Sequence, residues 1–381
     1  MNTTIETGKS VKSVASIFAE MTDQRKPKGI RYEFQPLLIL LSLAKLCRQD
    51  TPSEISDWVL NRSSWLREKL GLDWKRMPSL STWQRLIAEN IAVSEFDELV
   101  GRYFQAFSSG EQELLNLDGK VLRRTVSEET DRQLHLLALQ TSESNAVVEQ
   151  TALAEGENEI SAAKRLIERA ELRDRIVSGD AIFAQTELSN KVVEKGGAYL
   201  WKLRANQGQI YEQAKNHFTE MADKYAGRAS SLEKGHGRIE QRECLTSFRL
   251  AHQIEFPYLE QVFRIIRKSK QVKTGKQSQQ TIYGITSLSV EEFGAEQLLS
   301  LTRKHWSIEN GLHYRRDVTF KEDQVKQKSL AGGRVLAVMN NLIIGILRKL
   351  GWENIARSRR HFSAMIDEAL SLILFPIKLL L

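Results

Sequence analysis

The chain has 381 residues, of which 41% are hydrophobic and 27% are charged, and its formal net charge is +7. These values are ordinary for a folded globular protein, so they argue against a disordered chain and against a membrane protein. A single core usually stops growing below this length, which predicts two or three structural units.

The positive charge is concentrated near the C-terminal end. Residues 301–381 hold 14 Lys and Arg against 7 Asp and Glu, so the 300 residues before them carry no net charge. A second basic run, "FRIIRKSKQVKTGKQ" at 263–277, lies in a stretch without any acid. Such clusters suit a polyanion such as DNA, because bound cations release the counterions condensed on its phosphates. A solvated surface is the simpler alternative for either cluster alone.

Two cysteines, Cys47 and Cys244, are present, and no Cys/His spacing is typical of a zinc site. This predicts neither disulfides nor structural zinc, and it fits a reducing cytoplasmic setting. We expect no membrane helix, because no run approaches the roughly 20 apolar residues that one needs. The apolar end "LSLILFPIKLLL" is interrupted by Pro376 and Lys378, which favours a buried helix over a membrane anchor.

Residues 1–105 are predicted to form a helical unit. The run "FQPLLILLSLAKLC" is typical of a buried helix, and "TPSEISDWVLNRSSWLREKLG" is typical of an amphipathic one. The segment "SLSTWQRLIAEN" begins with Ser and Thr, which are frequent helix N-caps. We therefore expect an all-helical N-terminal domain.

A mixed α/β unit is expected over residues 106–350. The runs "LLNLDGKVL", "LHLLALQT" and "AVVEQTAL" predict strands, and the helical "EISAAKRLIERAEL" and another strand, "RIVSGD", follow them. Over about 196–288, strand-like runs such as "AYLWKLRA" and "QVFRIIRKS" alternate with long polar stretches, which predicts a β-rich insertion. A helical period returns from Glu291, and residues 351–381 are expected to form a helical tail.

Two aspartates follow apolar runs and adjoin a glycine, Asp118 in "LLNLDGK" and Asp180 in "RIVSGDA". Each is expected at the C-terminal edge of a buried strand, with "AIFAQTELSNKVVEKG" leaving Asp180 as a helix. Ligands of open α/β sheets bind at those strand ends. A helix cap or a turn residue is the alternative for either aspartate alone.

A third candidate acid lies in the segment "TRKHWSIENGLHYRRD". Helical spacing there puts His305, Glu309, His313 and Asp317 on one face at successive i+4 positions. A stripe of this polarity is poorly explained as part of the core. If the helix packs beside the sheet edge, Glu309 joins the two aspartates in one pocket.

Three carboxylates in one pocket repel each other unless cations are present. Mg²⁺, or Mn²⁺ in its place, takes such oxygen ligands and completes its shell with water and substrate phosphate. Two ions about 4 Å apart can activate a water or a 3′-hydroxyl and stabilise the leaving oxygen of a phosphodiester. Neighbouring groups would then contact the DNA, and this set comprises Lys120, Arg123, Arg124, His305, Asn310, His313, Arg315 and Arg316.

At these residues the chain resembles DDE transposases of the ISAs1 insertion-sequence group, the H-repeat-associated type within the IS4-like superfamily. The resemblance runs almost end to end, from "DQRKPKGIRYEFQPLLILLSLAKL" through "LDGKVLRR" and "IVSGDAIFAQTEL" to "HWSIENGLHYRRDVTFKED". It implies an RNase H-like catalytic core with Asp118, Asp180 and Glu309 as the three catalytic and metal-binding acids. It also implies a β-rich insertion between the second and third acids, and it makes the helical unit at 1–105 a transposase-associated domain that is a candidate for binding DNA ends.

The activity implied by the resemblance is magnesium-dependent hydrolysis at transposon ends, followed by attack of the freed 3′-hydroxyl on target DNA. The partners implied are transposon ends, target DNA and a second copy of the chain in a synaptic homodimer. Arg124, Gly156 and Ala198 depart from the pattern of the family, as do Thr302 and His305 in a signature of the last helix. None of these departures removes a metal ligand.

Three other functions stay open at this point. The chain could be a nuclease that cleaves DNA without strand transfer, or a DNA-binding protein that has lost catalysis. His305, Glu309 and His313 could also bind a transition metal such as zinc. Ligands eight residues apart on a straight helix are about 12 Å apart, however, which is too far for one ion.

Overall fold

The computed structural model describes residues 12–107, 112–128, 130–220, 227–235, 237–305 and 312–376. Its centre is a mixed nine-stranded sheet in the order β3-β2-β1-β4-β5-β9-β8-β7-β6. The strands are β1 (Glu113–Val126), β2 (Gln133–Thr141), β3 (Val147–Ala152), β4 (Arg175–Gly179), β5 (Ala198–Leu203), β6 (Gly227–Gly235), β7 (Arg238–Ser247), β8 (Gln261–Gln271) and β9 (Gln277–Thr286).

Strands β1, β4 and β5 run parallel at the middle of this sheet. Strands β2 and β3 extend it antiparallel on one side, and β9, β8, β7 and β6 extend it antiparallel on the other. The strands predicted before and after Asp180 in the sequence are confirmed as β4 and β5. The sequence suggested that the run "AYLWKLRA" belongs to the β-rich region. It instead forms β5, which pairs in parallel with β4. The β-rich region continues the central sheet through the pairing of β9 with β5.

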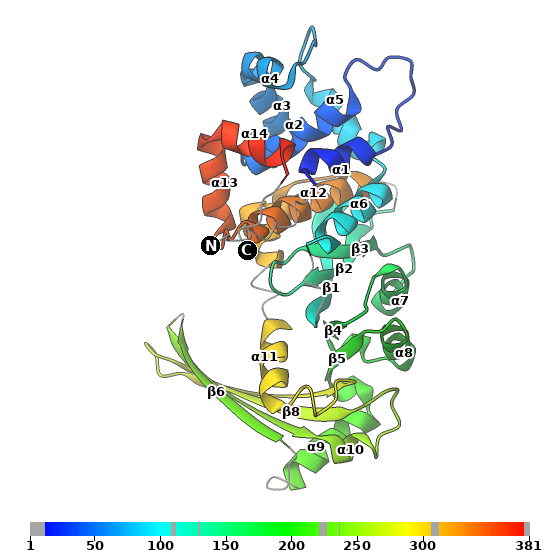
Figure 1. The fold of residues 1–381 in the computed structure, drawn as a ribbon, viewed down its shortest axis with the longest axis vertical. Helices are drawn as coiled ribbons and strands as arrows, with labels where there is room; N and C mark the ends of the chain where they lie inside the picture. Colours follow the sequence, from blue (N-terminus) through cyan, green and yellow to red (C-terminus); the bar gives the residue numbers. More distant parts are fainter. Residues whose placement is uncertain are drawn as a thin grey trace, which may run out of the picture.

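Helices cover both faces of the sheet. On one face α7 (Glu159–Arg169) packs on β2 and β3, and α8 (Thr186–Glu194) packs on β5. On the other face α11 (Ala295–His305) packs on β1, β4, β6 and β7 (Figure 1). Shorter helical segments are η2 (Ala181–Phe183), η3 (Ala205–Gln207), α9 (Gln209–Glu220), α10 (Phe248–Ala251), η5 (Arg315–Thr319) and η6 (Glu322–Gln324).

The described residues before β1 form helices, as their apolar periodicity predicts. The expected amphipathic helix is split at Arg62, where α3 ends and α4 begins. The elements are α1 (Val14–Glu20), α2 (Phe34–Leu46), α3 (Pro52–Asn61), α4 (Ser63–Leu70), α5 (Leu80–Arg85), the π-helical η1 (Leu86–Asn90) and α6 (Val93–Gln105). These helices lie at one end of the molecule, and β6–β9 with α9 and α10 lie at the other (Figure 1).

The C-terminal helices α12 (Leu330–Lys349), α13 (Ile355–Ala364) and α14 (Ile366–Leu374) return to the N-terminal end. Helix α12 lies between β1–β3 and the helices α2, α6 and η1. By length and composition it could cross a membrane, so the expectation that no such run exists was wrong. Because 83% of its apolar window is buried inside the protein, α12 is the central core helix.

A buried charge network joins the N-terminal and C-terminal helices. Asp50, after α2, accepts hydrogen bonds from Lys45 (3.1 Å) and from both terminal nitrogens of Arg359 in α13 (2.8 and 3.2 Å). Arg359 also donates to the Lys45 carbonyl (2.7 Å) and to the Thr319 carbonyl (2.8 Å). Its guanidinium lies 4.0 Å from the centre of the Phe320 ring. Segments more than 300 residues apart are therefore connected by ionic contacts shielded from water.

Candidate active site

Asp118 and Asp180 lie side by side on neighbouring parallel strands. The last parallel pair between β1 and β4 is Leu117 with Gly179, and the aspartates are the next residues on each strand. Neighbouring strands are about 4.8 Å apart. Two residues earlier on the same face, Ser178 donates a 2.7 Å hydrogen bond to Asn116, so the two acids face the same side of the sheet.

The two acids differ in how their strands continue. Strand β4 ends at Gly179, so Asp180 occupies the strand end that its sequence predicts. Strand β1 continues to Val126, so Asp118 lies inside a strand and its predicted position at a strand end was wrong. The reason is that β1 keeps its antiparallel partner β2 after its parallel partner β4 has ended.

Cations surround the Asp180 carboxylate. Lys202 on β5 donates a 2.8 Å hydrogen bond to Oδ1, and Arg204 lies 3.9 Å from Oδ2. His305, at the end of α11, has its Nε2 3.7 Å from Oδ1. His305 holds the pKa of the Asp180 carboxyl well below its usual range; burial acts in the opposite direction, and Lys202 adds to the lowering. Asp180 is therefore ionised at neutral pH.

His305 is fixed by contacts on both ring nitrogens. Its Nδ1 lies 2.9 Å from the Ser178 hydroxyl, and its Nε2 faces Asp180. The side chain is buried, so its position suits orientation of the carboxylate better than a contact with DNA. The chain Asn116–Ser178–His305–Asp180 connects β1, β4 and α11 in one polar network.

Asp118 faces the segment that follows α11. Its Oδ1 accepts a 2.9 Å hydrogen bond from the Gly119 backbone N–H, and its Oδ2 lies 3.5 Å from His313 Nδ1. Burial lowers the pKa of His313 to about 3, and Arg316 and Lys120 lower it further, so the imidazole is neutral. A neutral imidazole can donate a hydrogen bond to a neighbouring carboxylate without adding charge to the site.

The described members of the predicted polar stripe face the strands. His305 faces Asp180, His313 faces Asp118, and Asp317 pairs with Lys120 on β1. Glu309 and Asn310 lie outside the described residues. The described residues differ from the regular α-helix that the i+4 spacing assumed. Helix α11 is described as far as His305, and Arg315–Thr319 is π-helical.

The cations predicted to contact DNA divide into buried and exposed groups. Arg316 is 1% exposed and forms a 2.7 Å ion pair with Glu322, and Lys120 is buried beside Asp317. These two positions suit structural ion pairs better than contacts with DNA. Arg123 and Arg124 are exposed, and Arg315 is half-buried. Sequence spacing could not separate these groups, because their burial depends on the return of residues 317–324 onto β1.

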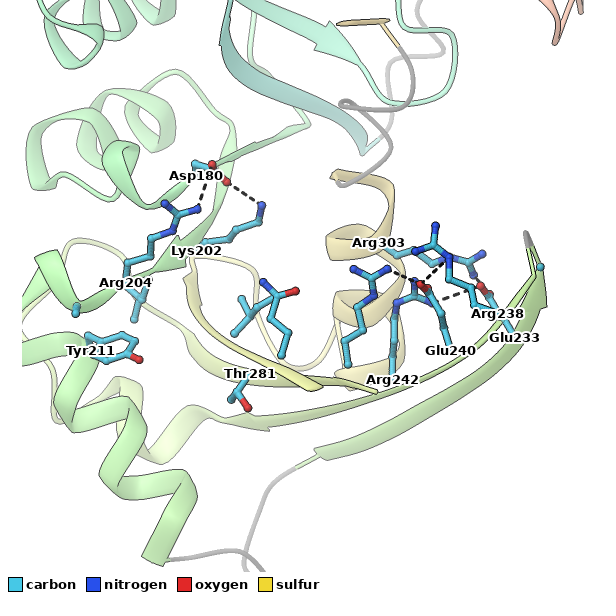
Figure 2. Close-up of a pocket in the computed structure, with 16 residues that line it drawn as sticks. Asp180, Lys202, Arg204, Tyr211, Glu233, Arg238, Glu240, Arg242, Thr281 and Arg303 are labelled. Carbon is cyan, nitrogen blue, oxygen red and sulfur yellow. Dashed lines mark hydrogen bonds and ion pairs between the residues drawn. The ribbon is translucent and has the colours of Figure 1, made fainter. Parts of the chain in front are cut away.

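A basic cleft that the sequence analysis did not assign begins at Asp180 (Figure 2). It has a volume of about 620 Å³ and continues from Lys202 and Arg204 over the concave face of β6–β9 to Arg303 on α11. Glu240 pairs there with Arg242, Arg267 and Arg238. The alternation of charged residues in "RIEQRE" was the available signal, since side chains two apart on a strand share one face.

Gly179 is required by close packing beneath the acid pair. A Cβ atom there would lie 2.8 Å from the Phe183 ring and 2.9 Å from the Trp201 ring. We expect Gly179→Ala to lower the free energy of unfolding by about 1–3 kcal/mol, because overpacking displaces either ring. Chemical denaturation measures this change. Gly235→Ala is the matched control, since a Cβ atom on that strand glycine meets nothing within 4 Å; equal effects of the two variants would contradict the packing argument.

The acid pair has the chemistry of a partial metal site. Two carboxylates at corresponding positions on adjacent strands offer oxygen ligands to a hard cation such as Mg²⁺, which takes its other ligands from water and phosphate. The described residues contain no group of three His, Cys, Asp or Glu side chains placed to bind a metal ion. The donor set therefore fits Mg²⁺ as two ligands that need a further oxygen donor.

The fold and the acid pair define a mixed α/β protein with a candidate metal-binding edge on its central parallel strands. The sequence profile described as "Transposase DDE domain" matches residues 123–345, and one described as "DDE_Tnp_1-associated" matches residues 15–104. Because the first match covers more than half of the chain, this protein belongs to the DDE-domain transposase family. That match begins five residues after Asp118.

Two relatives that match most of this chain carry transposase names, and a third, matched over a shorter stretch, is uncharacterized. The chain is 22% identical to "Putative transposase YncI" of Escherichia coli O157:H7 over 349 residues, which cover 89% of this chain and 88% of the relative. It is 23% identical to "H repeat-associated putative transposase YhhI" of E. coli K12 over 347 residues, with coverages of 88% and 90%. An "Uncharacterized protein in dhlA 3'region" of Xanthobacter autotrophicus is 29% identical over 217 residues, covering 55% of this chain and 72% of the relative.

Proposed function

We propose that this chain is a transposase of the ISAs1 group that binds the ends of its own insertion sequence, cleaves them and joins them to target DNA. The observation that carries this proposal is that Asp118 and Asp180 each directly follow the last parallel pair of β1 and β4, Leu117 with Gly179, in a member of the DDE-domain family. The order β3-β2-β1-β4-β5, antiparallel and then parallel, supports an RNase H-like core. The proposed units are residues 1–105, 106–350 with an insertion near 196–288, and 351–381.

Glu309 is the proposed third acid. The described residues on either side support this assignment, because His305 faces Asp180 and His313 faces Asp118. The three carboxylates would hold two Mg²⁺ ions, or Mn²⁺ in their place, because these ions take oxygen ligands.

The bound metal would polarise the scissile phosphate and lower the pKa of the attacking water or 3′-hydroxyl. The residues of this chain would orient the ligands and the DNA. His305 holds Asp180 in place through Ser178, and His313 stays neutral beside Asp118. Lys202 donates a hydrogen bond to Oδ1 of Asp180 in this structure. A metal ion bound to that oxygen would displace the ammonium group, which could then contact a phosphate.

The basic cleft supports a DNA path that leads to the acid pair. Arg204 and Arg303 are 72% and 51% exposed at their side chains, and both line the cleft. Cations along such a path fix the register of the DNA backbone without reading its sequence. Because two transposon ends must be held together for joining, we propose that the active assembly is a homodimer bound to DNA.

The direct test uses the purified chain with labelled duplexes that carry the ends of its own element. We expect no reaction in EDTA, nicking at the element boundary with Mg²⁺ or Mn²⁺, and joined products when target DNA is added. Adding EDTA after binding should stop cleavage and leave the protein–DNA complex intact, because the cations that hold the backbone do not need the metal. A gel that separates nicked from joined strands measures both steps.

The outcomes distinguish the alternatives. Nicking without joining would make the chain a nuclease, and binding without any reaction would make it a DNA-binding protein that has lost catalysis. Cleavage that proceeds unchanged in EDTA would contradict the proposed chemistry.

A further inference from the structure

A second basic cavity lies apart from the cleft at Asp180. It has a volume of about 480 Å³ and is formed by three segments: Arg48 after α2, residues 314–321, and residues 353–360 at the start of α13. Five cations line it, namely Arg48, Arg315, Lys321, Arg359 and Arg360, against one acid, Glu353. One residue from the N-terminal helices and two segments from the C-terminal part of the chain thus meet in one strongly positive cavity.

Four of these cations lack an acidic partner among the residues that the structure describes. Arg359 is neutralised by Asp50, but Arg48, Arg315, Lys321 and Arg360 form no ion pair with any residue that the structure describes. Arg315 Nη1 is buried without a hydrogen-bond partner in the described part of the chain, while its Nη2 donates to the Glu353 carbonyl at 3.4 Å. Like charges gathered around one cavity repel each other, so an anion bound there would be stabilised.

The other basic cleft has a different charge balance. Its arginines are paired, because Glu233 contacts Arg242 and Arg303, and Glu240 contacts Arg242 and Arg267. Its cations are therefore largely neutralised within the protein. Per volume, the second cavity holds the stronger unneutralised charge and is the better receptor for an anion.

The walls of the cavity indicate which anion fits. Ile355 and Ala356 begin the ten-residue helix α13, and the first backbone N–H groups of a helix favour phosphate oxygens. Two large side chains that line the cavity, Tyr314 and Val318, are 56% and 53% exposed, so both present apolar surface to water. Hydrogen-bond donors for phosphate beside an exposed aromatic and an aliphatic side chain suit a nucleotide backbone with its sugars and bases.

The cavity is connected to the acid pair through one short segment. Tyr314 and Arg315 line it, and the preceding residue, His313, lies 3.5 Å from the Asp118 carboxylate. Consecutive Cα atoms are 3.8 Å apart, so the wall of the cavity begins one residue from the side chain that contacts Asp118. The buried Asp50–Arg359 pair fixes the floor, which keeps the three segments in register.

We propose that this cavity binds a backbone phosphate of the same DNA whose scissile bond lies at the acid pair, using Arg48, Arg315, Lys321 and Arg360. The inference rests on the proposed function for the identity of the ligand. The chemistry required is that of a phosphodiester, and the cavity adds an anchor whose lining residues are all different from those of the cleft that begins at Asp180.

The test measures binding of a labelled 30-base-pair duplex, carrying the end of the element, to the full chain in EDTA at several salt concentrations. We expect the double variant Arg48→Ala/Arg360→Ala to bind about tenfold more weakly near 0.1 M salt and to lower the salt slope by about 2, since two phosphate contacts are lost. Arg48→Lys/Arg360→Lys should retain most of the affinity, because it keeps both charges.

Arg357→Ala is the matched control, since Arg357 is an exposed arginine on the same helix and does not line the cavity. It should bind within about twofold of the original chain. Equal affinities and salt slopes for the Arg48/Arg360 double variant and the original chain would overturn the inference, even if cleavage is observed. Displacement of the duplex by 10 mM inorganic phosphate at constant ionic strength would also overturn it, because the ligand would then be a free small anion. If the original chain does not cleave the DNA but binds it more tightly than the Arg48/Arg360 double variant, the proposed function alone would be rejected.

Discussion

Asp118→Asn and Asp180→Asn are each expected to reduce DNA cleavage by at least about 10³-fold, the loss that follows when several kcal/mol of metal-based stabilisation are removed. Asparagine keeps the size and one oxygen of the side chain, but it loses the negative charge that holds a divalent cation. The two variants should bind the DNA ends as tightly as the original chain, because the acids are ligands of the metal and not of the phosphate. Rates of strand nicking under single-turnover conditions, with binding measured in EDTA, separate these effects.

Asp174→Asn is a matched control for this experiment. Asp174 is exposed and directly precedes β4, whereas Asp180 directly follows it. Its φ of 57° is one that asparagine tolerates. It should cleave at nearly the original rate. If Asp118→Asn and Asp180→Asn cleaved as fast as this control, the acid pair would not be the catalytic site.

Asp50→Ala is expected to lower the free energy of unfolding by about 3–5 kcal/mol, since it leaves Lys45 and Arg359 as buried charges without their carboxylate. The side chains of these two residues are 1% and 2% exposed, so water cannot replace the lost partner without opening the core. Urea denaturation at neutral pH measures the change. Glu128→Ala removes an ion pair with Lys328 whose side chains are 63% and 64% exposed, and it should change stability by less than about 1 kcal/mol.

The same residue predicts a dependence on pH. Burial would raise the pKa of the Asp50 carboxyl, but Lys45 and Arg359 outweigh burial and hold the pKa below its ordinary value of 3.8. A lowered pKa in the folded state means that the stabilisation is present above about pH 4 and is lost as the pH falls through the lower, folded value. Asp50→Ala should therefore lose less stability on acidification than the original chain, and an equal loss would argue against this role.

Local sequence patterns were sufficient to predict many elements and the two aspartates. Alternating apolar residues predicted β1, β2 and β3, and the apolar period of "EISAAKRLIERAEL" predicted α7. Other elements lacked such a signal. Strand β6 alternates between half-buried and exposed residues at the edge of the sheet and buries no full face, while α9 lies in a stretch that reads as polar and irregular.

Burial of charged residues could not be read from the chain. The sequence around Lys120 and Arg316 does not distinguish them from exposed cations such as Arg123. Both side chains are nevertheless buried, Lys120 beside Asp317 and Arg316 beside Glu322. The same limit applies to Arg48, Arg315 and Arg360. They are separated by more than 300 residues at the extremes, and no periodicity relates them.

The amino-acid order alone was enough for the family resemblance, the mixed α/β class and the placement of two acids after strand-forming runs, because these depend on neighbouring residues. Tertiary structure decided that Asp118 lies within β1, that β5 joins the central parallel strands, and that the β-rich region extends the same sheet. It also decided where the basic cleft and the second cavity form. Strand pairing and burial are contacts between distant segments, and their energies depend on which surfaces meet when the chain has folded.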